Sequence, residues 1–292
     1  MAGIAVEYLI PRALGQDNIF CFCLALQARK GRVMDMQNST VDLFMFMGQS
    51  NMAGRGIVTA EHSVPAPALT EGAGYEYRAV SSPDRLYPIS EPFGRKENRK
   101  GGIDDGDRKT GSMVTAFVNA YYERTGIPVV GVSASKGGSR IDQWQPGGDF
   151  LQDAIARLDA ASEFLTAGQY RIRHRYMLWC QGESDGDMAK PGEQYRREFE
   201  RMLDAMLQAG IEKCFLVRIG HYNGTGGTDY SGIMMAQDAI AQTNADVVMV
   251  SRLFEQMRRR GLMKDDFHYF QEAYNLVGQE AGENAARYTA GR

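Results

Sequence analysis

Hydrophobic and polar residues alternate along this chain in two patterns, which together predict a layered α/β domain. Short apolar runs that end in glycine or polar residues are typical of strands buried on both faces of a sheet. Longer stretches with apolar residues three and four positions apart are typical of helices that cover a sheet. The two patterns alternate from Val41 onward. This alternation predicts strands that pair in a mostly parallel sheet, with helices packed on it.

Five strands and five helices follow from the pattern. The strands are expected at Val41–Met47, Pro128–Ser133, Arg173–Cys180, Cys214–Ile219 and Val247–Ser251. The helices are expected after Ser112, which can cap the first, and at Asp149–Leu165, Gly192–Gln208, Ser231–Gln242 and Phe270–Arg287. Methionine and aromatic residues on one face of the 192–208 helix are typical of a packed core rather than of a cofactor site.

Two segments do not fit this alternation. Residues 1–40 precede it and are interpreted as an N-terminal extension, either an extra strand or hairpin or a loosely attached tail, and residues 41–292 then form one domain. Thr59–Thr110 is rich in proline, glycine and charged residues. Irregular segments of this length inside a compact domain are usually functional covers or disordered. The aromatic residues Tyr87 and Phe93 beside Arg95 favour a cover.

Composition and charge narrow the class of protein. The chain has 292 residues, of which 43% are hydrophobic and 24% charged, as expected for a globular protein with a substantial core. The formal net charge of -3 is close to neutral. It predicts neither nucleic acid nor an anionic membrane as a partner. The oligomeric state is left open.

Cysteine usage and the absence of long apolar runs bear on location. The four cysteines are Cys21, Cys23, Cys180 and Cys214, and their spacing is not that of a metal site. Cys180 and Cys214 fall in predicted buried strands, where a free thiol behaves as a small apolar group. No apolar run is long enough to span a bilayer. We therefore expect a cytoplasmic protein, with secretion as the alternative because Ile19–Leu26 resembles a short signal-peptide core.

Three predicted strands end in clusters of polar and glycine residues. The clusters are Gly48-Gln49-Ser50-Asn51, Ser135-Lys136-Gly137-Gly138-Ser139 and Gln181-Gly182-Glu183-Ser184-Asp185. Because parallel strands bring their carboxyl ends to one edge of the sheet, the three clusters are expected to converge there. Ser50 is then a candidate nucleophile, although Gly-Gln-Ser-Asn by itself could be a simple turn.

A serine nucleophile needs a base that removes its proton, and His268 is the candidate. It follows Asp265 by three residues in Lys264-Asp265-Asp266-Phe267-His268, where the carboxylate can orient the imidazole. Glu183 is the alternative orienting acid, or a hydrogen-bond partner behind the site. The other three histidines, His62, His174 and His221, are interpreted as surface or core residues.

Acyl transfer also needs hydrogen-bond donors for the oxyanion. The backbone amides of Ser50 and of a glycine in Gly137-Gly138 are candidates, because glycine lets the backbone approach a ligand closely. The side-chain amide of Gln181 is a third candidate. A plain strand-to-helix turn is the alternative interpretation of the glycine pair.

Four blocks, in this order, resemble one branch of the SGNH hydrolases, the sialate O-acetylesterases and acetylxylan esterases. The blocks are Gly48-Gln49-Ser50-Asn51-Met52, Gly137-Gly138-Ser139-Arg140-Ile141-Asp142-Gln143-Trp144, Trp179-Cys180-Gln181-Gly182-Glu183-Ser184-Asp185 and Asp265-Asp266-Phe267-His268. The resemblance runs from about Val41 to the C-terminus. Cys180 departs from it, since many relatives have His or Tyr before the Gln, and we expect this to affect packing near the site more than the reaction.

The resemblance implies a function and a set of roles. It implies a flavodoxin-like fold of three layers, α/β/α, and a serine esterase, without metal or other cofactor, that removes O-acetyl groups from carbohydrates through an acetyl-enzyme. Ser50 is then the nucleophile, His268 the general base and Asp265 its partner, with Glu183 as the alternative acid. The implied oxyanion donors are the amides of Ser50 and Gly138 and the side chain of Gln181.

Two other functions remain open at this point. The same site would serve an aryl or lipid carboxylesterase, and a catalytically inactive relative would bind carbohydrate without cleaving it. The sugar is not specified either, whether sialic acid, xylan or another acetylated glycan, because specificity is set by loops that vary within one fold.

Overall fold

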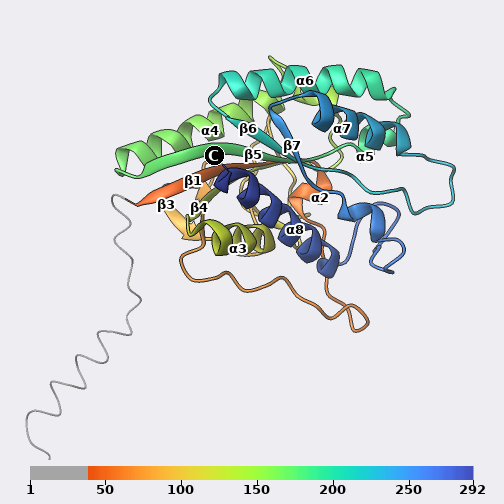
Figure 1. Cartoon of the computed structure of the whole chain (residues 1–292), viewed down its shortest axis with the longest axis horizontal. Coiled ribbons are helices and arrows are strands. Elements are labelled where there is room, and N and C mark those ends of the chain that lie inside the picture. The colour runs from red at the N-terminus through yellow and green to blue at the C-terminus, as the bar shows by residue number, and fades with distance from the viewer. Residues whose placement is uncertain (1–38, 292) are drawn as a thin grey trace, which may run out of the picture. The chain divides into compact units, whose positions relative to one another are not determined.

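A computed structural model describes residues 39–291 and shows one seven-stranded sheet between two layers of helices (Figure 1). The strand order is β3-β2-β4-β1-β5-β6-β7, and all neighbouring strands are parallel except β2 and β3. The α/β/α fold and the mainly parallel sheet predicted from the sequence are confirmed. The strands are β1 (Thr40–Gly48), β2 (Gly74–Arg78), β3 (Ser82–Pro88), β4 (Val129–Ser135), β5 (Arg171–Cys180), β6 (Lys213–Val217) and β7 (Val247–Ser251).

The expected strand count of five was too low, because β2 and β3 lie inside the segment expected to be irregular. β2 pairs in parallel with β4, and β3 pairs with β2 in antiparallel fashion at the edge of the sheet. β3 is largely exposed, and the prolines at its second and last positions are tolerated because an edge strand has one unpaired side. Neither strand contains an apolar run, since β2 alternates tyrosine with charged residues and β3 is polar with two prolines, so the hydrophobic pattern did not reveal them.

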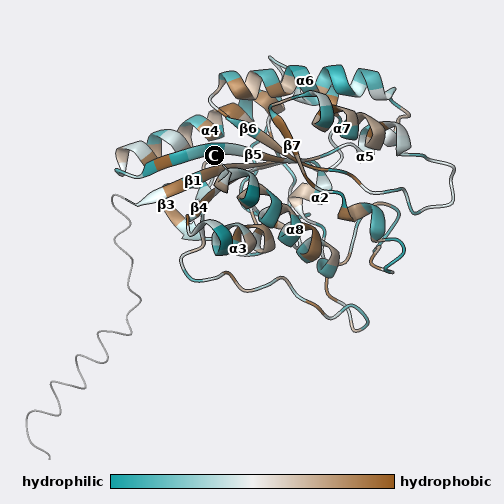
Figure 2. Cartoon of the chain, viewed as in Figure 1, coloured by the Kyte–Doolittle hydropathy of each residue, from teal (hydrophilic) through white to brown (hydrophobic). Residues whose placement is uncertain are grey.

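Helices cover both faces of the sheet. Two of them, α3 (Val114–Thr125) and α8 (Gln271–Ala290), pack on one face. The other face is covered by α4 (Asp149–Ala167), α6 (Gly192–Gln208) and α7 (Ser231–Thr243). Shorter helical turns are α2 (Ser50–Ala53), α5 (Glu183–Asp187), η1 (Ile141–Trp144) and η2 (Leu253–Gln256). Figure 2 shows the two-sided character of α6, in which hydrophilic and hydrophobic residues alternate along the ribbon.

The central strand β1 contributes to both cores because successive side chains point to opposite faces. Leu43, Met45 and Met47 belong to the core beneath α4, α6 and α7. Phe44 and Phe46 belong to the core against α3 and α8, where the ring of Phe44 lies edge-on to that of Phe117 at 5.2 Å. Burial on both faces explains why this strand is almost entirely apolar in the sequence, with Asp42 as its one charged residue.

The register of the sheet aligns the carboxyl ends of its three middle strands. Gly48, the last residue of β1, lies opposite Ser135 on β4 and opposite Cys180 on β5. The polar clusters that follow these three residues therefore start side by side at one edge of the sheet.

The first helix begins slightly later than expected. Its first residue is Val114, and Ser112 lies ahead of the N-cap position, which Met113 occupies. The Ser112 hydroxyl nevertheless accepts a hydrogen bond from the Val114 amide at 3.1 Å, so it satisfies one of the free amides at the helix start.

Two sequence interpretations fall partly outside the described residues. The proposed extension at residues 1–40 lies there except for its last two residues, as do Cys21, Cys23 and the short apolar run Ile19–Leu26. Within residues 39–291, no helix combines the length and the apolar character needed to cross a membrane.

Close packing of α3 on α8 depends on glycine and is testable. A Cβ at Gly282 of α8 would lie 2.3 Å from the carbonyl oxygen of Phe117 on α3. We expect Gly282→Ala to lower the free energy of unfolding by about 1–3 kcal/mol, because the added methyl group forces the helices apart. The matched control is Gly232→Ala in α7, where nothing lies within 4 Å of the added atom.

The control should be neutral or stabilising by up to about 1 kcal/mol, since alanine has the higher helix propensity. Urea unfolding of both variants measures the difference. Equal changes in the two variants would contradict the packing described for α3 and α8.

Candidate active site

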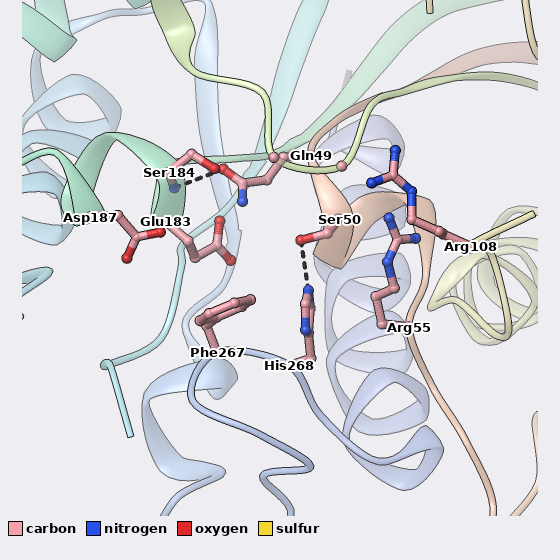
Figure 3. A pocket seen from close by; sticks show the side chains of 11 residues that line it. Gln49, Ser50, Arg55, Arg108, Glu183, Ser184, Asp187, Phe267 and His268 are labelled. Atoms are coloured by element: carbon pink, nitrogen blue, oxygen red, sulfur yellow. Dashed lines mark hydrogen bonds between the residues drawn. The ribbon is translucent and has the colours of Figure 1, made fainter. Parts of the chain in front are cut away.

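The three polar clusters meet at a cavity of about 260 Å³ at the carboxyl edge of the sheet (Figure 3). The loops after β1, β4 and β5 and the loop before α8 all contribute to its wall. Ser50 and His268 lie at its centre, with Glu183 and Asp187 on one side and Arg55 and Arg108 on the other. The lining residues are Gln49, Ser50, Arg55, Arg108, Gly137, Gly138, Glu183, Ser184, Asp187, Phe267 and His268.

Ser50 is held at the cavity by the tight exit from β1. Gly48 has a φ of 139°, and a Cβ there would lie 2.0 Å from the carbonyl oxygen of Cys180, so only glycine fits. The next amide, that of Gln49, donates to the same carbonyl at 3.0 Å. The chain then turns directly into α2 with Ser50 as its first residue. Its side chain is thereby placed at the end of the strand, where it is buried apart from the cavity.

Ser50, His268 and Asp265 form a continuous row of hydrogen bonds. The Ser50 Oγ lies 2.9 Å from His268 Nε2, and His268 Nδ1 lies 2.9 Å from Asp265 Oδ2. The second carboxylate oxygen of Asp265 accepts the backbone amides of Phe267 at 3.1 Å and His268 at 2.7 Å. One aspartate thus fixes both the backbone and the ring of His268.

The ionisation of Asp265 follows from these contacts. Partial burial raises the pKa of its carboxyl, but the hydrogen bonds from His268 and from the backbone amides of Phe267 and His268 outweigh burial and hold this pKa below its ordinary value. Asp265 is therefore a carboxylate at neutral pH. A carboxylate in this position holds the proton of the imidazole on Nδ1 and leaves Nε2 free to accept a proton from Ser50.

Glu183 lines the same cavity, but no hydrogen bond joins it to His268. It is buried, and its Oε1 accepts a hydrogen bond from Asn51 Nδ2 at 2.5 Å. Burial raises the pKa of Glu183 to about 7. Asn51 also donates to the carbonyl of Phe267 at 3.0 Å and accepts from the Tyr274 hydroxyl at 2.6 Å. Glu183 thus contacts the histidine loop through Asn51.

The candidate oxyanion donors differ in where they lie. Gly138, which has a φ of 70°, and Ser50 both line the cavity. Within residues 39–291, neither backbone amide has a hydrogen-bond acceptor. Gln181 is fully buried outside the lining of the cavity, and its side-chain nitrogen donates to Gln49, Ser139 and Asp185. The structure does not bring the Gln181 amide to the cavity, so its direct role as an oxyanion donor stays a prediction.

Several lining residues had no role assigned from the sequence. Gln49 accepts three hydrogen bonds through its Oε1, from the amides of Gly182 and Ser184 and from Gln181 Nε2, at 3.1 to 3.2 Å. Its place in the first cluster was a signal that could have been used. Arg55 lies four residues beyond the end of that cluster, and Arg108 comes from the Thr59–Thr110 segment. Neither arginine lies in a periodic pattern or in a matched block.

The remaining histidines lie away from this cavity. The ring of His62 stacks on that of Phe270 at 3.7 Å, and His174 Nδ1 lies 2.8 Å from a carboxylate oxygen of Glu212. His221 lines a separate cavity beside Arg258 and Arg259. Among the described residues, no group of three or more His, Cys, Asp or Glu is arranged to hold a metal ion.

The raised pKa of Glu183 makes stability depend on pH. Between its ordinary value of 4.5 and about 7, the folded state holds this proton while the unfolded chain releases it, so the contribution of Glu183 to stability falls as pH rises. Glu183→Gln removes the titration but keeps an oxygen for Asn51. We expect the free energy of unfolding of the wild type, minus that of the variant, to fall by roughly 3 kcal/mol across this interval.

Urea unfolding of both proteins at several pH values from 4 to 8 measures this difference. A difference that stays constant over the whole range would show that Glu183 keeps an ordinary pKa in the folded protein.

Comparison with known proteins gives one sequence family and several similar folds. Residues 40–287 match the sequence profile of the family described as carbohydrate esterase, sialic acid-specific acetylesterase. A probable carbohydrate esterase of Arabidopsis thaliana is 29% identical over 164 residues, which are 55% of this chain and 61% of that protein. The alignment thus spans less than two thirds of the relative's length.

Two solved structures are similar in fold. The crystal structure of the same Arabidopsis protein has a TM-score of 0.63 at 22% identity and covers 85% of this chain and 98% of its own. A carbohydrate acetylesterase from Xanthomonas citri has a TM-score of 0.56 at 14% identity and covers 86% of this chain and 57% of its own. At such identities the likeness shows the fold alone. The profile match spans nearly all of the described residues, and the chain therefore belongs to the sialic acid-specific acetylesterase family of carbohydrate esterases.

Proposed function

We propose that this protein is a serine esterase that removes O-acetyl groups from carbohydrates. The observation that carries the proposal is the row of hydrogen bonds from Asp265 through His268 to Ser50 at the wall of the cavity. A hydroxyl, an imidazole and a carboxylate in this order are the groups that acyl transfer requires. Membership of a carbohydrate esterase family supports the same reaction.

The proposed reaction has two halves. Ser50 Oγ attacks the acetyl carbonyl carbon while His268 Nε2 takes its proton, and the carbonyl oxygen becomes an oxyanion. The bond to the sugar oxygen then breaks as His268 returns the proton to that oxygen, which leaves an acetyl group on Ser50. Water attacks this acetyl-enzyme with His268 again as the base, and acetate and free Ser50 result.

We propose the free amides of Ser50 and Gly138 as the oxyanion donors. Backbone N–H groups fixed in the fold need no reorganisation as charge develops, which is why they stabilise the transition state effectively. Gln181 would act indirectly, because its side chain donates hydrogen bonds to Gln49 in the cavity wall and to Ser139 and Asp185. Asp265 is our choice of triad acid over Glu183, since only Asp265 is hydrogen-bonded to His268.

The lining of the cavity favours a sugar over a lipid or aryl group. Arg55, Arg108, Glu183, Ser184 and Asp187 offer charged and hydroxyl groups that suit a polyhydroxylated substrate, and Phe267 is the one large apolar side chain in the described lining. A small acetylated sugar and an acetylated position on a larger glycan, sialic acid or xylan among them, both remain within this proposal. An aryl or lipid carboxylesterase and an inactive binding protein are the alternatives.

We also propose a cytoplasmic location, with secretion as the alternative. Cys180 and Cys214 are free and fully buried, and burial raises the pKa of both thiols. Unpaired cysteines fit a reducing compartment but do not require one.

Ser50→Ala tests the reaction directly. We expect release of acetate from acetylated sugars and from p-nitrophenyl acetate to fall by roughly four to six orders of magnitude, because Ser50 carries the hydroxyl that, among the described residues, is hydrogen-bonded to His268 Nε2. A panel of acetylated monosaccharides, xylo-oligosaccharides and aryl and lipid esters then ranks substrates by kcat/KM. Retained hydrolysis by the variant would rule out Ser50, and a preference for long acyl chains would favour the lipid esterase.

Asp265→Asn distinguishes the two candidate acids. It should lower kcat by roughly 10²- to 10⁴-fold, because a neutral partner no longer holds the proton on Nδ1 or stabilises the imidazolium. Asp266→Asn is the matched control, since the neighbouring carboxylate contacts the Tyr222 hydroxyl instead of His268 and should leave kcat within about threefold. A larger loss of kcat in Glu183→Gln than in Asp265→Asn would assign the role to Glu183.

A further inference from the structure

A buried ion pair lies directly behind the glycine turn of the cavity. Asp105 is completely buried, and Arg55 is buried apart from its edge on the cavity. Their closest approach is 2.8 Å, between Arg55 Nη2 and Asp105 Oδ2. Arg108 lies on the outer side, with its Nε donating to the carbonyl of Asp105 at 3.0 Å. Burying a carboxylate costs free energy of desolvation unless an opposite charge and hydrogen bonds offset it. Removing either partner of this pair would therefore leave an uncompensated buried charge.

Asp105 is also bonded to the backbone of the turn. Its Oδ1 accepts the amide of Gly137 at 2.8 Å and Arg55 Nη2 at 3.0 Å. A Cβ at Gly137 would lie 2.3 Å from Arg55 Nη2 and 2.7 Å from Asp105 Oδ1. The pair therefore packs against the turn so closely that residue 137 has no room for a side chain.

The geometry of the turn sets the direction of the Gly138 amide. The amide of Ser139 donates to the carbonyl of Lys136 at 3.3 Å, and Gly138, the third residue of the turn, has a φ of 70°. A positive φ at this position is typical of a type II turn. Type I and type II turns differ in the orientation of the peptide between their two central residues. A change of turn type would therefore rotate the N–H of Gly138 away from its present direction.

We propose that Asp105 and Arg55 are positioning residues that hold this turn in the conformation that presents the Gly138 amide to the oxyanion. The proposal rests on the esterase function above. By fixing the Gly137 amide from outside the cavity, Asp105 opposes rotation of the following peptide. Arg55 holds the Asp105 carboxylate in place, and neither residue needs to touch the substrate for this role.

Arg55 also connects the turn with the histidine loop. Its backbone carbonyl accepts a hydrogen bond from Lys264 Nζ at 2.8 Å, and Lys264 directly precedes Asp265. One residue therefore contacts the loop that carries the base and, through Asp105, the loop that carries the proposed oxyanion donor. Asp105 comes from the Thr59–Thr110 segment, so part of the expected cover lies behind the site as a support.

The pair also has an electrostatic consequence. One carboxylate, Asp105, faces the two guanidinium groups of Arg55 and Arg108, the latter at 3.6 Å. With two guanidinium groups and one carboxylate, the net charge of this group is positive by one, and the group packs against Gly137, the residue before Gly138. A fixed positive charge near a developing oxyanion lowers the energy of the transition state more than that of the neutral ester.

Steady-state kinetics of the Asp105→Ala variant test the proposal through kcat and KM. We expect kcat for acetyl ester hydrolysis to fall by roughly 10²- to 10³-fold, the usual loss for one oxyanion donor, while KM changes by less than about threefold. The matched control is Asp153→Ala. Asp153 is a buried carboxylate that accepts the Ile103 amide at 2.9 Å and pairs with Arg157 at 2.8 Å, away from the cavity.

The control should lose stability to a similar degree but keep kcat within about threefold. An equal loss of kcat in Asp153→Ala would mean that any loosening of the segment impairs catalysis, and it would overturn the proposal. A rise in KM with unchanged kcat in Asp105→Ala would overturn it too, since that result indicates substrate binding.

A second measurement does not depend on activity. Labelling the protein with ¹³C-carbonyl lysine and ¹⁵N-glycine restricts the NMR spectrum to glycine amides that directly follow a lysine. The sequence has three such pairs, Lys30-Gly31, Lys100-Gly101 and Lys136-Gly137. We expect the Gly137 amide to be protected from hydrogen exchange in the wild type and in Asp153→Ala, and to exchange at least tenfold faster in Asp105→Ala. Unchanged protection in Asp105→Ala would overturn the proposal even if Ser50→Ala had already disproved the esterase reaction.

Discussion

Hydrogen bonds between loops at the carboxyl edge of the sheet are the constraint on which the site depends. The Gln49 side chain accepts hydrogen bonds from backbone amides that follow β5. Asn51 donates both to Glu183 and to the carbonyl of Phe267, in the loop that carries His268. These groups are largely buried, and buried polar groups must find partners because leaving one unpaired costs about 1–3 kcal/mol. The residues on either side of Ser50 therefore fix the proposed nucleophile relative to the loops that carry the other candidate groups.

This constraint explains how residues far apart in sequence reach hydrogen-bond geometry. Ser50 and His268 are separated by 218 positions, yet their side-chain atoms lie 2.9 Å apart. The parallel register brings Gly48, Ser135 and Cys180 side by side, and each loop then starts from a fixed point. The rigid sheet supplies the placement, and the polar contacts between loops supply the orientation.

Much of the fold could be predicted from the sequence, because buried parallel strands and amphipathic helices leave strong periodic patterns. β1 is almost entirely apolar, with Asp42 as its one charged residue, and α6 has its apolar residues on one face. β2 and β3 could not be found in this way. β3 is an exposed edge strand with two prolines, and its pairing depends on β2 and β4 rather than on its own composition.

The candidate site likewise contains residues that could be predicted from the sequence and residues that could not. Ser50, Asp265 and His268 were predicted from their residue types, their spacing and the resemblance to a family, and the structure brings their side chains together. Gln181 and Glu183 were predicted as well, but whether a buried side chain faces the cavity or a neighbour is decided by packing. Arg55 and Asp105 are 50 positions apart in irregular segments, where no periodicity signals a contact.

The most direct test of the central claim is to identify the residue that carries the acetyl group during turnover. Acid quenching of the enzyme with an acetylated sugar in the steady state, followed by peptide mass spectrometry, locates the group. The mechanism predicts the mass of one acetyl group on Ser50, increased in amount when deacylation is slowed. Acetylation on another residue, or rapid hydrolysis by the wild type with Ser50 unmodified under all conditions, would contradict it.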